Sequence, residues 1–211
     1  MTIKAKGLVK FALGAVPALL VALPVTMVAE QGYGKSCPSG YVEFHEAVEP
    51  LGDLIAQGEG DWNAVNRGYA GDTPGGIRSV TGKNFDQHTV NEVIQLQRWT
   101  IYAAGRYQFI PVTLRFAVAN SSVKGTDKFN AETQNKLFAA LLQYKRPAVG
   151  AYLRGDHDYL GWALNEMAKE WASVEYRYGR SYYSGIGGNR AHISRADLET
   201  VLVECREELN K

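Results

Sequence analysis

The chain has 211 residues, a formal net charge of +1, 45% hydrophobic residues and 21% charged residues. Once residues 1–30 are set apart, the remaining length suits one domain with its own hydrophobic core. A net charge this close to zero excludes the strong positive field by which many proteins attract nucleic acid or acidic lipid.

Residues 1–30 have the layout of an export signal. Three lysines precede residues 11–29, which carry no charge. This stretch is nearly as long as the roughly 20 apolar residues that cross a bilayer. Its end is a poor match to a small-x-small cleavage site, because Met27 is large. We therefore expect an uncleaved membrane anchor, with a cleaved signal peptide or a buried core helix as the alternatives.

Residues 31–40 are rich in Gly, Ser and Lys and contain a proline, which is typical of a linker. The chain has two cysteines, Cys37 in this linker and Cys205 near the end. An exported location permits a disulfide between them. Closing so long a loop would stabilise the fold by about 4–5 kcal/mol in the chain-entropy model. The alternative is two unpaired thiols, with Cys205 buried in the last helix.

Residues 41–211 are expected to form one mostly helical domain. The first helix should end after Gln57, since Gly58 and Gly60 follow and leave Glu59 at its C-terminal end. Residues 62–85 are polar and rich in glycine, which favours short β-hairpins or loops.

The later helices are marked by capping residues, prolines and apolar residues at helical spacing. A glycine-rich loop is expected over residues 182–189. The fold class is therefore α+β, mostly helical, with a small β region. The expected helix starts follow Thr89, Asn130 and Ser194, or lie at Pro111, Pro147 and Asp158.

Glu59 lies between two glycines at the end of a helix, a position suited to a general acid. Glycines let a substrate approach the backbone closely, and the partial negative charge of a helix C-terminus raises the pKa of a nearby carboxyl. An ordinary surface glutamate is the alternative. If Glu59 cleaves a glycosidic bond, the presence of a second carboxylate nearby would decide between hydrolysis and another reaction at that bond. Asp61, Asp72 and Asp86 are candidates, but none has distinctive surroundings, and taken singly each favours a turn role, because aspartate is common in turns.

Two further segments carry groups that suit sugar binding. Arg106, Tyr107 and Gln108 follow a glycine and precede a helix. Aromatic rings stack on pyranose faces, while amides and guanidinium groups bond hydroxyl and acetamido groups. Tyr182 and Tyr183 lie in the glycine-rich loop and could wall a cleft. Core packing of the Tyr107 ring, and a surface loop with one buried tyrosine, are the alternatives.

No motif for a metal or cofactor is expected in this chain. His45 and Glu46 begin like a zinc-protease motif, but Glu49 stands where the second histidine belongs. The other histidines are isolated, and neither a nucleophile elbow nor a phosphate loop occurs. Amidase, protease and nucleotide-dependent activities therefore lose support.

Several of these segments together resemble the phage endolysins related to lambda lysozyme. The resemblance covers roughly residues 45–205, and it depends on the joint order of short motifs. The segments, in order, are Gln57–Gly60, Gly105–Gln108, Phe129–Gln134, Leu153–Asp156, Trp171–Ser173 and Ser181–Asn189.

The resemblance implies a lysozyme-like fold with a cleft between two lobes. It also implies cleavage of the β-1,4 bond between N-acetylmuramic acid and N-acetylglucosamine in peptidoglycan, leaving 1,6-anhydro ends. In this family one glutamate acts first as acid and then as base on the sugar's own C6 hydroxyl, and it maps onto Glu59. The family's cleft tyrosine and glutamine map onto Tyr107 and Gln108. Asp61, Arg106, Tyr182 and Tyr183 complete the expected sugar-binding set.

The resemblance further implies lysis of a bacterial host from its periplasm by a monomer that does not bind nucleic acid. Residues 11–29 would hold the enzyme on the inner membrane before release, as in endolysins with signal-anchor-release segments. Lambda lysozyme itself lacks such an anchor. Two alternatives remain open: hydrolysis of the same bond with Asp61 or Asp72 as second carboxylate, and an exported wall-binding protein without activity.

Overall fold

The structure, a computed structural model, describes residues 43–186 and 188–211, which belong to one compact unit, Ser39–Lys211. The expected anchor and the whole expected linker, residues 31–40 with Cys37, lie outside the described residues, so the anchor and the disulfide stay predictions. No helix among the described residues is long and apolar enough to span a membrane. Cys205 is buried in the last helix, and burial raises the pKa of its thiol to about 11.

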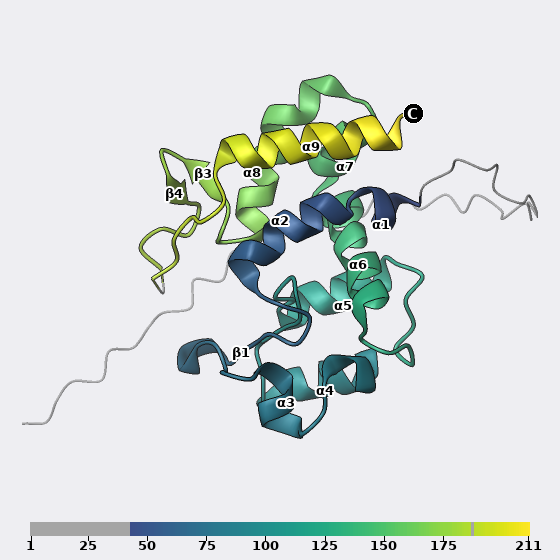
Figure 1. Ribbon diagram of the computed structural model, residues 1–211, viewed down its shortest axis with the longest axis vertical. Coiled ribbons are helices and arrows are strands. Elements are labelled where there is room, and N and C mark those ends of the chain that lie inside the picture. The colour runs from purple at the N-terminus through teal and green to yellow at the C-terminus, as the bar shows by residue number, and fades with distance from the viewer. Residues whose placement is uncertain (1–42, 187) are drawn as a thin grey trace, which may run out of the picture. The chain divides into compact units, whose positions relative to one another are not determined.

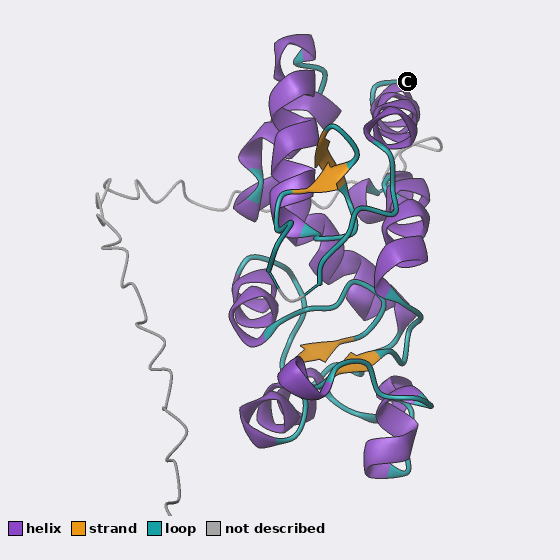
Figure 2. Ribbon diagram, turned by 90° about the vertical axis from the view of Figure 1, so that its left-hand side faces the viewer, coloured by secondary structure: helices purple, strands orange, loops and turns teal. Residues whose placement is uncertain are grey.

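The domain is mostly helical with two small antiparallel sheets, which confirms the α+β class (Figures 1 and 2). Its first half contains α1 (Phe44–Ala47), α2 (Glu49–Glu59), β1 (Val65–Asn66), α3 (Gly76–Thr81), α4 (Val90–Trp99), β2 (Ala103–Ala104) and α5 (Pro111–Ala119). Its second half contains α6 (Ala131–Ala140), a π-helical turn (Leu141–Lys145), α7 (Pro147–Leu153), α8 (Leu160–Glu170), β3 (Glu175–Arg177), β4 (Arg180–Ser181) and α9 (Arg195–Leu209). Short 3₁₀ turns occupy Gly68–Ala70, Phe85–Gln87 and His157–Tyr159.

The helix starts expected after Thr89, Asn130 and Ser194 and at Pro111 and Pro147 are confirmed. The helix expected from Asp158 instead begins at Leu160, because Asp158 belongs to the preceding 3₁₀ turn. The Thr89 hydroxyl accepts a hydrogen bond from the Glu92 amide at 3.2 Å, while the Glu92 carboxylate accepts one from the Thr89 amide at 2.6 Å. This reciprocal pair satisfies two backbone donors that the first turn leaves free. Asn130 and Ser194 also cap their helices, and Pro111 and Pro147 open theirs.

Helix α3 was not predicted, because residues 62–85 were expected to form only hairpins or loops. It has six residues and lies between Gly75 and Gly82, both at a φ of 77°. It carries only two apolar side chains, the buried Ile77 and the partly buried Val80, which are too few to show a helical period in the sequence. The Ile77 amide donates to the Asn63 carbonyl at 2.9 Å, a contact outside the helix that fixes where it begins.

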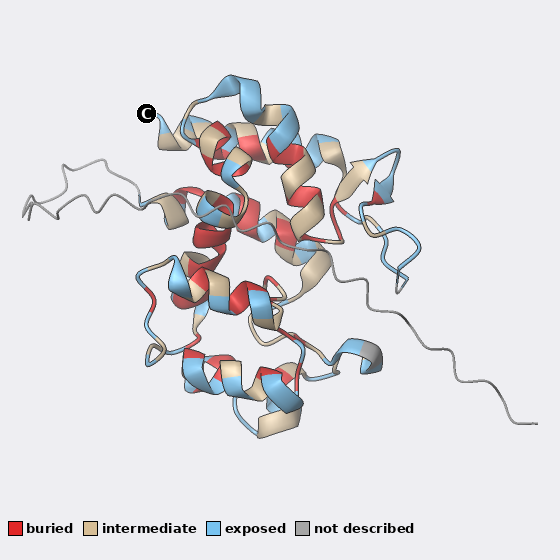
Figure 3. Ribbon diagram, turned by 180° about the vertical axis from the view of Figure 1, so that it is seen from behind, coloured by how far each residue is buried: buried red, intermediate tan, exposed pale blue. Residues whose placement is uncertain are grey.

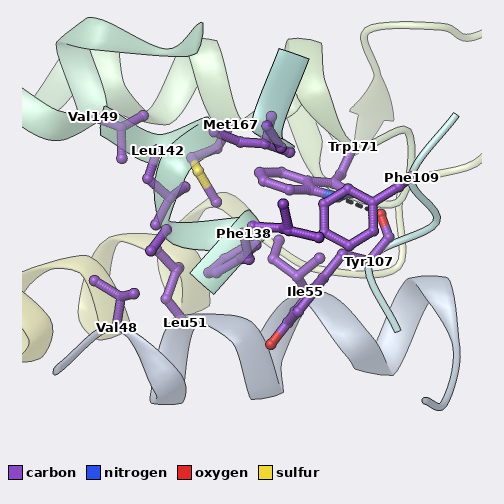
Figure 4. Close-up of a cluster of buried hydrophobic side chains, with 14 of the residues drawn as sticks. Val48, Leu51, Ile55, Tyr107, Phe109, Phe138, Leu142, Val149, Met167 and Trp171 are labelled. Atoms are coloured by element: carbon purple, nitrogen blue, oxygen red, sulfur yellow. Dashed lines mark hydrogen bonds between the residues drawn. The ribbon is translucent and has the colours of Figure 1, made fainter. Parts of the chain in front are cut away.

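The core joins α2 to the later helices through aromatic side chains (Figures 3 and 4). The Tyr107 ring stacks on Phe138 with centroids 4.3 Å apart, and Phe138 packs against Trp171 at 5.3 Å. The indole Nε1 of Trp171 donates to the Tyr107 carbonyl at 3.1 Å. Ile55 brings α2 into the same cluster. The ends of α2 and α8 are therefore held close to the segment that follows β2.

A buried amide, Gln134 of α6, ties two loops together. Its Oε1 accepts from the Arg106 amide at 2.9 Å, and its Nε2 donates to the Trp62 carbonyl at 3.1 Å. A Cβ at Gly105 would lie 2.3 Å from Gln134 Oε1, so only glycine fits there. The segments after α2 and after β2 are thus fixed to one side chain.

Candidate active site

A cleft of about 1240 Å³ opens at the end of α2. Its walls come from the C-terminal ends of α2 and α8, the loop after β1, the segment from β2 to α5, and the loop before α9. The loop after β1 and the loop before α9 approach the end of α2 from different sides (Figure 1). Residues far apart in the sequence therefore face one another across a single cavity.

Glu59 is the last residue of α2 and lines this cleft. The chain turns away at Gly60, whose φ of 144° is a conformation that favours glycine. The hydroxyl of Ser173 donates to Glu59 Oε1 at 2.6 Å, and the Ser173 amide lies 3.4 Å from the same oxygen. Among the described residues, no hydrogen bond is made to Oε2. One carboxyl oxygen is therefore held while the other is left for a ligand.

The pKa of Glu59 is raised above its usual value. Burial is the largest cause, because the charged carboxylate loses solvation in the half-buried end of the cleft. The negative charge of Asp72 adds to this effect. The hydrogen bonds from Ser173 and the nearby His192 act in the opposite direction but do not cancel it. A carboxyl of this kind keeps its proton at higher pH than an exposed glutamate, as a general acid must.

Gly58 allows α2 to approach Ser173. A Cβ at position 58 would lie 2.3 Å from Ser173 Cβ and 2.7 Å from its Oγ. Real Cβ atoms do not come this close, so any larger residue would push the two segments apart. The absence of a side chain at Gly58 is thus a condition of the Glu59–Ser173 hydrogen bond.

The Gly58→Ala variant is expected to lose about 1–3 kcal/mol of unfolding free energy through this overlap, despite the better helix propensity of alanine. Urea unfolding measures the change. Gly161→Ala in α8 is the matched control, since a Cβ there meets nothing within 4 Å and should stabilise the helix by up to about 1 kcal/mol. Equal stability of Gly58→Ala and the wild type would mean that α2 and Ser173 are not in close contact.

Among the expected sugar-binding residues, Gln108 and Tyr183 line the cleft. Gln108 has a φ of 48°, which is unusual for a residue other than glycine, and its side-chain Nε2 donates to the Gly105 carbonyl at 2.9 Å. The Tyr183 hydroxyl donates to the Lys169 carbonyl at 2.6 Å. Both side chains are therefore fixed in place before any ligand binds.

Arg106 and Tyr107 do not line the cleft, so their expected role in sugar binding is corrected. Tyr107 is only 2% exposed, and its hydroxyl donates to Asn135 Oδ1 at 2.5 Å. The Arg106 guanidinium lies 4.4 Å from the centroid of the Trp62 ring and pairs with Asp53 at 2.5 Å. Both side chains therefore pack against the core or its edge. Of Arg106, Tyr107 and Gln108, only Gln108 lines the cleft.

The predicted role of Asp61 and Tyr182 in sugar binding is corrected as well, since neither residue lines the cleft. Asp61 is exposed, and its Oδ1 accepts from the Asn63 amide at 2.7 Å, which is the turn role that aspartate often takes. Tyr182 packs edge-on against the ring of Tyr183, with the ring centroids 5.2 Å apart.

Asp72 does line the cleft, in contrast to Asp61 and Asp86. Its Oδ1 accepts from Asn66 Nδ2 at 2.9 Å, and the backbones of these two residues form a β-bridge. Its charge is felt at Glu59. Of the three aspartates considered as second carboxylate, Asp72 is thus the one that shares the cavity with Glu59.

Glu170 is a further carboxylate in the cleft lining, but its charge is already balanced. It accepts from Lys145 Nζ and from Arg146 Nε, both at 2.6 Å, and its side chain is only 5% exposed. This ion-pair cluster fixes the end of α8 beneath the cleft. Glu170 is therefore a structural carboxylate.

Several lining residues were not predicted as site residues: Asn66, Arg67, Ser173, Asn189, Arg190 and His192. Ser173 belongs to a segment on which the family resemblance depends, but its contact with Glu59 spans 114 residues. No local pattern in the sequence could reveal a contact over that separation. No group of three or more His, Cys, Asp or Glu side chains suited to a metal ion occurs in the part of the chain that the structure describes.

Comparisons with known proteins add no relative to this picture. No protein-family model, no curated protein and no solved structure matches the chain.

Proposed function

We propose that this chain is a phage endolysin that cleaves the β-1,4 bond between N-acetylmuramic acid and N-acetylglucosamine in peptidoglycan. The observation that carries the proposal is the Glu59 carboxyl, half-buried in an open cleft with a raised pKa and one oxygen free. At about 1240 Å³ the cleft exceeds the usual 300–1,000 Å³ of small-ligand pockets, which suits a chain of sugars.

The proposal includes a lysozyme-like arrangement of two lobes. In support of it, β1, α3 and α4 gather at one end of the domain, while α7, α8 and α9 gather at the other (Figure 1). Glu59 lies at the end of α2, which packs against α9 and α6. The order of segments that resembles the lambda lysozyme-like endolysins is the second support.

The proposed reaction needs no water and no second carboxylate. Protonated Glu59 gives its proton to the glycosidic oxygen as the bond from that oxygen to C1 of N-acetylmuramic acid breaks. The resulting carboxylate then takes the proton of the C6 hydroxyl of the same sugar, and O6 bonds to C1. Glu59 ends protonated, and the product carries a 1,6-anhydro ring. Ser173 holds Oε1 throughout, so that Oε2 can carry the proton in both steps.

Ser173→Ala is expected to shift the alkaline limb of the activity profile to higher pH. The hydrogen bonds from Ser173 lower the Glu59 pKa, so loss of the hydroxyl raises that pKa further. The maximal rate should fall by roughly two- to tenfold, as one positioning hydrogen bond is lost. Cleavage rates across pH measure both effects. Ser79→Ala, which removes an exposed hydroxyl outside the cleft, should change neither. An alkaline limb that moves to lower pH in Ser173→Ala would contradict the statement that Ser173 lowers the pKa of Glu59.

Hydrolysis of the same bond is the second candidate, and the position of Asp72 favours it over any scheme with Asp61. In that reaction Asp72 would position a water molecule. Masses of soluble fragments separate the candidates, because anhydro ends are lighter than hydrolysed ends by one water. Asp72→Asn is expected to keep anhydro cleavage and to lower the pKa of Glu59, moving the alkaline limb to lower pH. Loss of all cleavage in Asp72→Asn, with hydrolysed ends in the wild type, would support hydrolysis instead.

The proposed site of action is the host periplasm, with tethering to the inner membrane before release. This part rests on the charge pattern of residues 1–30. Mass spectrometry of the mature N-terminus distinguishes a retained anchor from a cleaved signal peptide. Clearing of purified cell walls by the wild type separates an enzyme from an exported wall-binding protein.

A further inference from the structure

Two arginines line the cleft without an acidic partner. Arg67 follows β1, and Arg190 lies in the loop before α9. Both are exposed. The arginine–carboxylate ion pairs of the domain involve Arg106 and Arg146, and within residues 43–186 and 188–211 neither Arg67 nor Arg190 forms one. Their guanidinium groups are thus free to meet a ligand.

The acidic residues of the cleft do not balance these two charges. Glu170 is already paired with two cations. Burial raises the pKa of Glu59, because it disfavours the charged form. Asp72 is the exposed acidic side chain of the lining, and its hydrogen bond from the neutral Asn66 amide does not offset its charge. Two exposed arginines therefore accompany one exposed carboxylate in the described lining, which leaves an excess of positive charge among its exposed groups.

The wall formed by the last loops has the same sign. Residues 176–194 contain no aspartate or glutamate, but they contain three arginines and one histidine. Arg190 and His192 of this segment line the cleft beside Tyr183. Arg67 lines the same cleft from the loop after β1. That loop and the loop before α9 reach the end of α2 from different sides (Figure 1). A strand that passes over Glu59 would meet a cation from each wall.

We propose that Arg67 and Arg190 bind carboxylates attached to the glycan strand, and that they make the cleft selective for acidic over neutral polysaccharide. A guanidinium group matches a carboxylate with two parallel hydrogen bonds. Peptidoglycan offers such carboxylates on its peptide stems and, once the stems are removed, on its lactyl groups. This inference rests on the proposed function, because it names the feature of the substrate that the same cleft recognises.

Binding is measured in the Glu59→Gln background, so that strands are not cut during the titration. Three ligands are compared: glycan strands with peptide stems, strands stripped of stems that expose lactyl carboxylates, and stripped strands whose carboxyls have been converted to amides. Arg67→Gln and Arg190→Gln are each expected to weaken binding of acidic strands about three- to tenfold, with no effect on the amidated strands. Arg98→Gln, an exposed arginine of α4 outside the cleft, is the control of equal charge.

An effect with peptide-bearing strands alone assigns the contact to the stems, and an effect that persists with stripped strands assigns it to the lactyl groups. Equal binding of acidic and amidated strands, or equal effects of Arg98→Gln and the two cleft variants, overturns the inference. Absence of binding to all three ligands overturns it as well. The proposed function is judged separately, by whether the wild type cleaves the strands and releases shorter fragments.

Discussion

Glu59→Gln is expected to lower the rate of peptidoglycan cleavage by about 10²–10⁴-fold, the usual contribution of a positioned general acid. Glutamine keeps the size and the carbonyl oxygen that Ser173 binds, but it cannot give a proton to the glycosidic oxygen. Release of soluble fragments from purified cell walls measures the loss. The effect should lie in kcat, since the amide still fits the cleft.

The same variant is expected to be more stable than the wild type at neutral pH. The pKa of Glu59 in the folded protein is raised above its usual 4.5, so the folded state holds the proton more tightly than the unfolded chain. The stability that the protonated group contributes is therefore fully present below about pH 4.5 and is lost as the pH rises through the folded-state pKa. Glutamine does not ionise, so Glu59→Gln should melt at a higher temperature than the wild type at pH 7, and the difference should shrink toward pH 4.

Glu49→Gln is the matched control, because Glu49 opens the same helix and is exposed. It should keep full activity and lose only a few tenths of a kcal/mol from the helix dipole. Wild-type clearing by Glu59→Gln would remove Glu59 from the mechanism. A Glu59→Gln protein that melts below the wild type at pH 7 would contradict the raised pKa.

Tyr107→Ala is expected to destabilise the domain by about 3–5 kcal/mol, as large-to-small changes of buried aromatic residues do. The ring fills the space between α2 and Phe138, and it also lies 5.8 Å from Phe109 and 6.2 Å from Trp62. A Cβ added to Gly52 of α2 would lie only 2.6 Å from the Tyr107 hydroxyl oxygen, which shows how tightly the helix packs on this residue. Urea unfolding measures the loss.

Tyr107→Phe separates packing from the polar contact. It keeps the ring but loses the hydrogen bond to Asn135, so it should cost about 1–3 kcal/mol, less than alanine. Tyr144→Ala, at a site that is 58% exposed, is the control and should change stability by less than about 0.5 kcal/mol. If Tyr107→Ala melted like the wild type and lost only activity, the ring would belong to the cleft after all.

The contrast between Tyr107 and Gln108 shows which part of the candidate site can be predicted from the sequence and which part cannot. Both stand in one short segment with suitable chemistry, and both were expected in the cleft. Which of two adjacent side chains points inward depends on the backbone at Gln108, where φ is 48°. The residues on either side of this turn are held by distant partners, since the Arg106 amide donates to Gln134 and the Tyr107 and Phe109 rings are buried in the core, and these contacts cannot be inferred from neighbouring residues.

Local signals predicted local structure well. The helices after Thr89, Asn130 and Ser194 begin where their capping residues stand, because capping needs only residues three positions apart. The glycines around Glu59 likewise place it correctly at the end of α2. Helix α3 is too short, and too dependent on the distant Asn63 carbonyl, to show a pattern of its own.

The sequence also could not show that Asp72, and not Asp61, shares the cleft with Glu59. Each follows a glycine in a polar stretch, and nothing nearby distinguishes them. The β-bridge between Asn66 and Asp72 brings one of them back toward α2, while Asp61 serves the turn that leaves the helix. Asp72 thus lies in the cleft because the chain folds back on β1 at this point, and not because of any feature of the neighbouring sequence.

The distance along the chain between Glu59 and Ser173 has a consequence for biosynthesis. Translation delivers α2 before Ser173 and before α9, which packs on α2. Until those segments have emerged, the Glu59 carboxyl has neither its hydrogen-bond donor nor the burial that raises its pKa. A nascent chain that stops short of Ser173 therefore carries a glutamate at position 59 that lacks the environment of a general acid.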